Sequence, residues 1–254
     1  MNHKPITILL FIFISCKFEN SDYSSPSNPS AITELNVVSD IPLPPGFKRV
    51  ETSRDSFGHW LRDISLKKDK QVHLYDGSLK KNQSVQFAVL DIPVGKRDLQ
   101  QCADAVMRLR AEYLYSHKKF DEIKFTDNAG TIYLLNPAAN RTEFENYLEN
   151  VFGWCGSASL EKQLKPVDTI SKIFPGDVFI RGGFPGHAMI VADVAINDKG
   201  ERIFLLAQSY MPAQDIHIVK NPMDRKLSPW YKVDDAIEIF TPEWKFYKNQ
   251  LRRW

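Results

Sequence analysis

A titratable side chain and a carboxamide are placed by their spacing at the same end of a predicted β-hairpin. Residues 188–196 and 202–210 are apolar runs rich in β-branched side chains, and the Asn-Asp-Lys-Gly sequence of residues 197–200 supplies the turn between them. His187 precedes the first run and Gln208 comes near the end of the second, so antiparallel pairing brings them together. An imidazole exchanges protons near neutral pH. The sequence therefore predicts a general base at His187, with Gln208 orienting it or donating to an oxyanion.

A hydrolase built on this pair also needs a nucleophile, for which Cys155 is the candidate. It stands in a Trp-Cys-Gly-Ser sequence between two predicted helices, close to the N-terminus of the second. The positive end of a helix dipole there lowers the pKa of a thiol. The alternative is that Cys155 is a small buried hydrophobic side chain, which is the commoner fate of a free cysteine. We expect no disulfide between Cys155 and Cys102, because Cys102 falls on the buried face of another predicted helix.

Four further polar residues are candidates for binding. Ser209 and Gln214 follow Gln208 at the end of the hairpin, and Asp177 stands in a Gly-Asp pair that is also typical of a turn. Glu112 lies four residues after Arg108 on a predicted helix, where a solvated ion pair is the simpler interpretation. If that helix face points into the cleft instead, Glu112 could act as an acid or base.

Composition argues against several other classes of function. The formal net charge is only +2, and no run of Lys and Arg alternates with aromatic residues, so nucleic-acid binding is not predicted. His59, His73 and His217 show no spacing typical of a metal site. The Gly-rich residues 182–186 neither open a helix nor carry a P-loop lysine, so phosphate binding is not expected. The sequence therefore predicts neither a metal nor a cofactor.

The elements that must position these residues alternate irregularly, which predicts an α+β fold. We expect a mainly antiparallel sheet with helices packed on one face, broadly like papain. The clearest helix should run from Asp98, as N-cap, to about Ser116, with Gln101 completing a capping box. Other helices are predicted at residues 55–64, from Thr142 to about Gly153, from about Ser157 and from Thr241, and other strands at 47–51, 72–75, 84–92, 123–125, 131–135, 216–219 and 236–240.

The N-terminal sequence resembles an export signal. Lys4 precedes an apolar run over residues 6–14, too short to span a bilayer, and Cys16 follows at once. Residues 1–15 therefore resemble a bacterial lipoprotein signal, which implies that Cys16 is lipidated and anchors the protein to a membrane of the cell envelope. The alternative is a conventional cleaved signal. Residues 16–45, rich in Ser and Pro, are predicted to be a tether, and residues 46–254 a single globular domain.

Part of the chain resembles the NlpC/P60 and CHAP peptidases, papain-like bacterial enzymes that cut cell-wall peptides. The resemblance covers about residues 154–209 and rests on the Pro-Gly-Asp-Val-Phe-Ile sequence of residues 175–180 and the Gly-His-Ala-Met-Ile-Val sequence of residues 186–191. The chain departs from the NlpC/P60 pattern at Cys155, which lacks the usual preceding Asp and lies only 32 residues before His187. The resemblance implies a cysteine nucleophile, a histidine base and a peptide or peptidoglycan ligand.

A second resemblance covers nearly the whole domain. Residues 74–77, 98–115 and 206–214 are similar to an uncharacterised bacterial lipoprotein family, catalogued as domain of unknown function 4846. This resemblance implies an envelope protein without an assigned reaction, and the family is not expected to require a cysteine at position 155. The leading hypothesis is an envelope hydrolase acting on peptide or amide bonds of the cell wall. The alternative is a non-catalytic binding or scaffolding lipoprotein.

Overall fold

The computed structural model describes Met1, residues 34–234 and residues 238–254. The segment Leu35–Trp254 forms one compact unit. The predicted signal, Cys16 and most of the predicted tether lie outside the described residues. The tether prediction is wrong over residues 35–45, because the folded unit already includes them. Val38 and Ile41 are fully buried there, and a 3-10 helix, η1, spans Val38–Asp40.

A large antiparallel sheet forms the centre of the unit, and in the described part of the chain it has nine strands. Six strands follow one another in the order β2-β9-β8-β7-β6-β13, β5 extends that edge, β1 pairs with β7 and β10 pairs with β8. The longest strands, β7 and β8, form the predicted hairpin, with Ile190 opposite Ala207 and Ile196 opposite Arg202. The strands of the sheet are β1 (Phe47–Arg49), β2 (Gln86–Val89), β5 (Lys165–Pro166), β6 (Val178–Arg181), β7 (His187–Asn197), β8 (Arg202–Gln208), β9 (His217–Val219), β10 (Tyr231–Lys232) and β13 (Leu251–Arg253).

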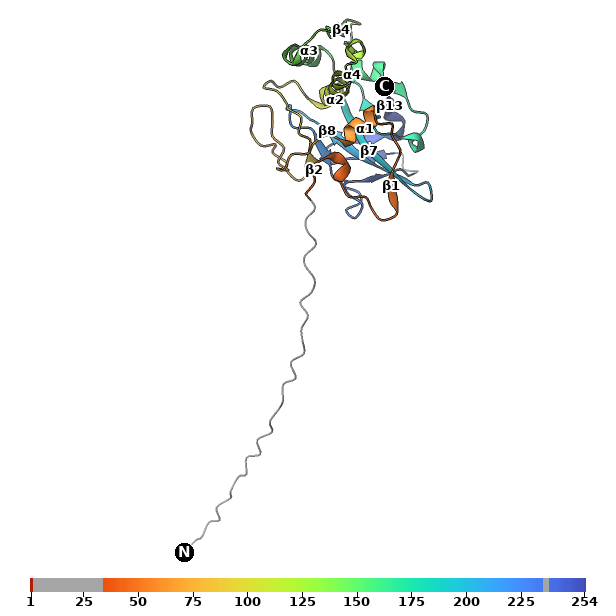
Figure 1. Ribbon diagram of the computed structural model, residues 1–254. Helices are drawn as coiled ribbons and strands as arrows, with labels where there is room; N and C mark the ends of the chain where they lie inside the picture. The colour runs from red at the N-terminus through yellow and green to blue at the C-terminus, as the bar shows by residue number, and fades with distance from the viewer. Residues whose placement is uncertain (2–33, 235–237) are drawn as a thin grey trace. The chain divides into compact units, whose positions relative to one another are not determined.

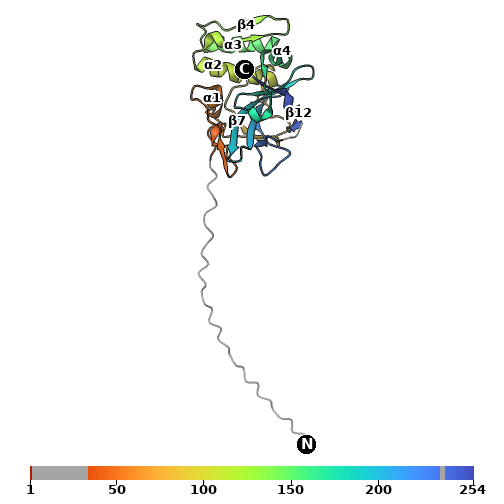
Figure 2. The same cartoon turned by 90° about the vertical axis from the view of Figure 1, so that its right-hand side faces the viewer.

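Both faces of the sheet are buried, and alternate residues of β7 show why. Ala188, Ile190 and Ala192 belong to the larger hydrophobic core, while Met189 and Val191 belong to a second core on the opposite face. The helices cover the first face: α1 and α2 pack on β7, and α4 packs on β6. Figures 1 and 2 both show α2, α3 and α4 grouped at one end of the folded unit. The fold is therefore α+β, as predicted.

Four α-helices occur among the described residues, and each follows a polar or small N-cap residue. They are α1 (Phe57–Arg62), α2 (Cys102–Ser116), α3 (Arg141–Trp154) and α4 (Ser157–Gln163). In α3 the Asn140 side chain accepts from the Glu143 N–H, and the Glu143 carboxylate accepts from the Asn140 N–H, so the capping box begins two residues before the predicted start at Thr142. Short 3-10 helices η2 (Phe120–Glu122), η3 (Ile170–Lys172) and η4 (Lys248–Gln250) complete the helical elements.

The start of α2 differs most from its prediction. Asp98 does not cap the helix, because its Oδ1 accepts hydrogen bonds from the Ala213 N–H, at 2.7 Å, and from Gln101 Nε2. Asp104 instead accepts from the Gln101 N–H at 3.0 Å, and the helix begins at Cys102. A tertiary partner therefore removes the predicted cap and shortens the helix by one turn.

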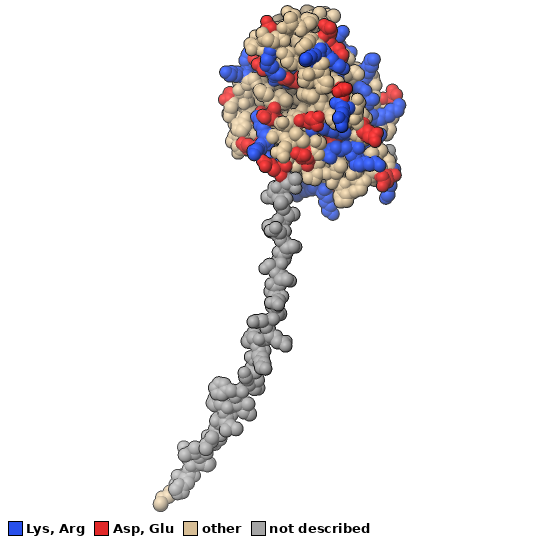
Figure 3. Space-filling model, in the orientation of Figure 1, with Lys and Arg blue, Asp and Glu red and all other residues tan. Residues whose placement is uncertain are grey.

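The second core is closed by the C-terminal segment. A two-stranded hairpin of β11 (Glu238–Phe240) and β12 (Lys245–Tyr247) places Ile239 and Phe246 in it. The helix predicted from Thr241 is absent: Thr241 and Trp244 bond each other across a turn, and a strand follows. The predicted strand at residues 72–75 makes only isolated bridges. A further hairpin, β3 (Lys124–Thr126) with β4 (Ile132–Leu134), forms as predicted. Positive and negative side chains are interspersed on the face drawn in Figure 3.

Candidate functional site

The hairpin brings His187 and Gln208 into direct contact. His187 is the first residue of β7 and Gln208 the last of β8, and the His187 Nε2 atom lies 3.0 Å from Gln208 Oε1. Each residue is only 1% exposed. The pairing that places them together follows the apolar periodicity and the turn of residues 197–200, so this contact was foreseeable from the sequence.

The amide of Gln208 is oriented by partners on its other side. Gln208 Nε2 donates to Glu243 Oε2 at 2.7 Å and lies 3.4 Å from His217 Nε2. A carboxylate only accepts hydrogen bonds, so the nitrogen of the amide must face Glu243 and the oxygen must face His187. His187 therefore carries its proton on Nε2, which leaves the lone pair of Nδ1 to accept a proton from another group.

Glu243 is in turn held by a buried lysine. Lys80 Nζ lies 2.5 Å from Glu243 Oε2, and Lys80 is 8% exposed. The His217 Nδ1 atom donates to the Asp215 carbonyl, so its Nε2 can accept from Gln208. Nothing in the sequence pointed to Lys80 or Glu243 here: Lys80 stands in a polar loop, and Glu243 was placed in a helix that does not form.

Aromatic rings surround the imidazole of His187. The ring centroids of Tyr210, Trp244 and Phe246 lie 5.0, 5.1 and 5.8 Å from that of His187. Burial lowers the pKa of His187 to about 4, and burial likewise lowers the pKa of His217 to about 3. Both imidazoles are therefore neutral at pH 7, and a neutral His187 can accept a proton.

A cavity of about 440 Å³ opens in front of this group. His187, Tyr210 and Trp244 line one side of it, and the first turn of α2, including Cys102, lines another. Phe184 and Met211 stand at its edge with 95% and 63% of their surface exposed. We call this cavity the cleft.

Cys102 is the first residue of α2, and its thiol faces the start of β7. The thiol receives a hydrogen bond from the backbone N–H of Ala188, the residue after His187. The first N–H groups of an α-helix have no partner within the helix, so those at the start of α2 can stabilise negative charge. Burial raises the pKa of the Cys102 thiol. At rest the cleft therefore pairs a neutral thiol with a neutral imidazole.

Cys155 lines the same cleft in a less favourable environment for a thiolate. It caps the C-terminus of α3, where the helix dipole is negative, and burial raises its pKa to about 11. The negative charge of Asp127 and, to a smaller extent, that of Asp104 in the cleft wall add to this effect. Cys155 and His187 thus line the same cleft, but the position of Cys102 at a helix N-terminus suits the chemistry better.

The other predicted site residues lie outside the cleft lining. Ser209 Oγ is 2.9 Å from the carbonyls of both Gln100 and Gln214, so it ties the end of β8 to the segment before Cys102. Asp177 binds Arg253 through both carboxylate oxygens. Glu112 is buried rather than solvated, and it is shared by Arg108 and Arg141, as described below.

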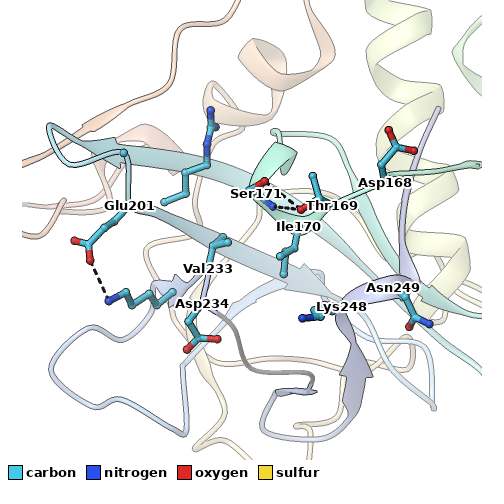
Figure 4. A pocket seen from close by; sticks show the side chains of 12 residues that line it. Asp168, Thr169, Ile170, Ser171, Glu201, Val233, Asp234, Lys248 and Asn249 are labelled. Carbon is cyan, nitrogen blue, oxygen red and sulfur yellow. Dashed lines mark hydrogen bonds and ion pairs between the residues drawn. The ribbon is translucent and has the colours of Figure 1, made fainter.

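A larger cavity, of about 690 Å³, lies elsewhere on the unit (Figure 4). Its polar side chains are largely engaged with one another: Lys232 pairs with Glu201, and Thr169 bonds Ser171. Its lining residues, all of them described, include neither Cys nor His. It offers no nucleophile and base pair, so the cleft remains the candidate site.

Neither a metal-binding cluster nor a membrane-spanning helix is present in residues 34–234 and 238–254. No group of three or more His, Cys, Asp or Glu side chains there is arranged to hold a metal ion. None of the helices in this part of the chain has the length and apolar character needed to cross a membrane.

Comparison with known proteins gives one match. A family model described as a domain of unknown function (4846) matches residues 37–133 and 132–253, which together cover most of the chain. No curated protein and no solved structure matches the chain significantly.

Proposed function

This chain belongs to the family described as domain of unknown function 4846. That description names no reaction, so we propose the activity from the residues that line the cleft. We propose that the protein is a cysteine hydrolase of amide bonds, with Cys102 as nucleophile and His187 as general base. Gln208 holds the base in position. One observation carries this proposal: a thiol at a helix N-terminus and an imidazole with a free Nδ1 acceptor line the same cavity.

The reaction begins from the neutral pair. His187 Nδ1 accepts the thiol proton as Cys102 Sγ attacks the carbonyl carbon of the amide. The N–H groups at the start of α2 stabilise the oxyanion of the tetrahedral intermediate. The imidazolium then gives its proton to the departing amine, which leaves an acyl-thioester on Cys102. Water, deprotonated by His187, hydrolyses the thioester and restores the thiol.

Gln208 and Glu243 contribute by fixing one tautomer of His187. If the Gln208 amide were reversed, its nitrogen would donate to His187 Nε2 and the ring proton would move to Nδ1. A ring protonated at Nδ1 cannot accept the thiol proton there. Glu243, anchored by Lys80, opposes this reversal because it accepts from the amide nitrogen. We infer that this chain of contacts keeps the base in its reactive form.

We propose the location of the protein from its N-terminus, and its substrate class from that location. The sequence of residues 1–16 supports an exported lipoprotein, anchored by Cys16 to a membrane of the bacterial envelope. We infer that an amide hydrolase in that compartment acts on peptides of the cell wall, which also agrees with the resemblance of residues 154–209 to cell-wall peptidases.

Digestion of cell-wall fragments tests this function. Purified full-length protein is incubated with soluble muropeptides, and new amine termini are identified by mass spectrometry. Cys102→Ala is expected to abolish cleavage, whereas Cys155→Ala, the matched control in the same cleft, should retain it. If Cys155→Ala abolishes cleavage and Cys102→Ala does not, the nucleophile assigned here is wrong.

A non-catalytic role is the second candidate, and one observation favours it. Burial raises the pKa of Cys102 and lowers that of His187, so the resting pair lacks the charge separation of an activated thiol. A binding protein would retain the cleft and its exposed Phe184 and Met211 without needing a reactive thiolate. Binding of muropeptides to wild-type protein without cleavage, and equally to Cys102→Ala, would support this second role.

A further inference from the structure

A second, smaller cavity adjoins the cleft behind the segment that leads to Cys102. It has a volume of about 110 Å³ and lies between residues 93–100, α2 and α3. Leu99 and Phe152 line both this cavity and the cleft, so the two spaces are neighbours. A ligand in the cleft would therefore pass close to the contents of the smaller cavity.

Two side chains that line this cavity each carry a buried hydrogen-bond donor with no partner among the described residues. The donors are Nε2 of Gln100, which is 1% exposed, and Nη2 of Arg108, which is 5% exposed. The orientation of the Gln100 amide is fixed, because its Oε1 lies 3.5 Å from Arg108 Nη1 and must face that donor. Leaving two such donors buried and unbonded is costly, and a guanidinium costs more than a neutral group.

The acidic residues nearby do not supply the missing acceptors. Glu112 accepts from Arg108 Nε at 2.7 Å and from both terminal nitrogens of Arg141. Glu145 and Glu149 also line the cavity, but they are paired with Arg141 at 2.8 Å and with Arg97 at 3.3 Å respectively. Three carboxylates are thus matched with three guanidinium groups, and Arg108 Nη2 still has no partner.

We propose that this cavity binds a carboxylate group, which accepts from Gln100 Nε2 and Arg108 Nη2 through its two oxygens. Arginine is suited to carboxylates because its donors match their geometry. A volume of about 110 Å³ exceeds the ~30 Å³ that one liquid water occupies, so a small carboxylate fits. Since the cavity adjoins the cleft, the bound group belongs to a carboxylate-bearing peptide; this assignment rests on the proposed function, whereas carboxylate binding itself does not.

Titration with acetate tests the site without requiring catalysis. The full-length protein, isotope-labelled at the Arg side chains, is titrated with sodium acetate, with acetamide as a neutral analogue and sodium chloride at equal ionic strength as a salt control. Acetate is expected to shift the Arg108 Nε–H resonance saturably, and acetamide and chloride are not. Cys102→Ala should bind acetate as well as wild type, so failure of the catalytic proposal would leave this result intact.

Variants of Gln100 complete the test. Gln100→Glu, which replaces the donor with a like charge, should weaken acetate binding at least about tenfold. The matched control is Gln71→Glu, the same change at an exposed position, and it should bind as wild type. Gln100→Met removes the amide without adding charge and serves if Gln100→Glu does not fold. Equal shifts with acetamide or chloride, unchanged binding by the folded Gln100 variant, or a crystal structure with acetate showing only water in the cavity would overturn the proposal.

Discussion

Alkylation of the two cysteines as a function of pH tests the electrostatics of the cleft directly. An ordinary thiol has a pKa near 8.5, and burial raises that of Cys102 further, so below about 3% of it is thiolate at pH 7. The pKa of Cys155 is raised to about 11, which leaves about 0.01% thiolate at that pH. Since only thiolate reacts, and the pKa of Cys155 is the one raised as far as about 11, Cys102 should be alkylated faster than Cys155.

The rates are measured with iodoacetamide from pH 5 to 9, and the modified residue is identified by peptide mapping. The Cys102 rate should rise close to tenfold per pH unit up to about pH 8, because each unit raises the thiolate fraction tenfold. Cys102→Ala and Cys155→Ala assign the two phases. A rate for Cys102 that is already high at pH 5 and flat to pH 8 would refute the reasoning, since it would show a resting thiolate–imidazolium pair.

Three further predictions concern stability. His187→Ala should lower the free energy of unfolding by about 1–3 kcal/mol in chemical denaturation, because His187 is buried among three aromatic rings and leaves Gln208 unbonded. Asp193→Asn should cost about 3–5 kcal/mol, because the buried Asp193 carboxylate binds two arginines, whereas the same change at the exposed Asp198 should alter stability by less than about 0.5 kcal/mol. The folded-state pKa values of His187 and His217, about 4 and about 3, lie below the unfolded value near 6.5, so the unfolded state binds more protons as the pH falls. The free energy of unfolding should therefore be constant above about pH 6.5 and decrease from there towards pH 4. The decrease should be shallower in His217→Gln. Denaturation midpoints that do not change over this pH range would contradict the burial of the two histidines.

The part of the site that comes from one hairpin was predictable from the sequence. The alternating apolar residues of β7 and β8 and the turn between them determine their register, and that register places His187 beside Gln208. The burial of His187, however, was not evident from its position at the start of a strand. A histidine at the first position of a strand can line a cavity and still be 1% exposed, because Trp244 and Phe246 reach it from the C-terminal hairpin.

Cys102 was not predicted as a candidate nucleophile, because a tertiary contact overrides the local capping sequence. Asp98 followed by Gln101 is a sound capping sequence, and a helix starting there puts Cys102 one turn inside on the buried face. In the folded unit the Ala213 N–H donates a hydrogen bond to the Asp98 carboxylate, and the helix starts at Cys102 instead. The backbone of residue 213 reaches Asp98 only through the fold, so no local pattern could reveal the competition.

The same limitation explains the Arg108–Glu112 pair. Opposite charges four residues apart on a helix are usually solvated, which is how the sequence was interpreted. Both residues are in fact buried, because α3 lies over this face of α2 and Arg141 of α3 forms an ion pair with Glu112. The burial leaves Arg108 Nη2 without a partner, and this is the observation from which the carboxylate site is inferred.

The position of the cleft depends on how closely α2 approaches the sheet. Small side chains line this interface, with Ala188 and Ala192 on β7 and Ala103 and Ala105 on α2, all within one hydrophobic core. Close packing transmits any added volume to its neighbours. Because the Cys102 thiol bonds the Ala188 N–H, a bulkier residue at position 188 would displace the first turn of α2 and with it the thiol. The hairpin thus positions His187, and the small residues beneath α2 determine how closely the Cys102 thiol can approach it.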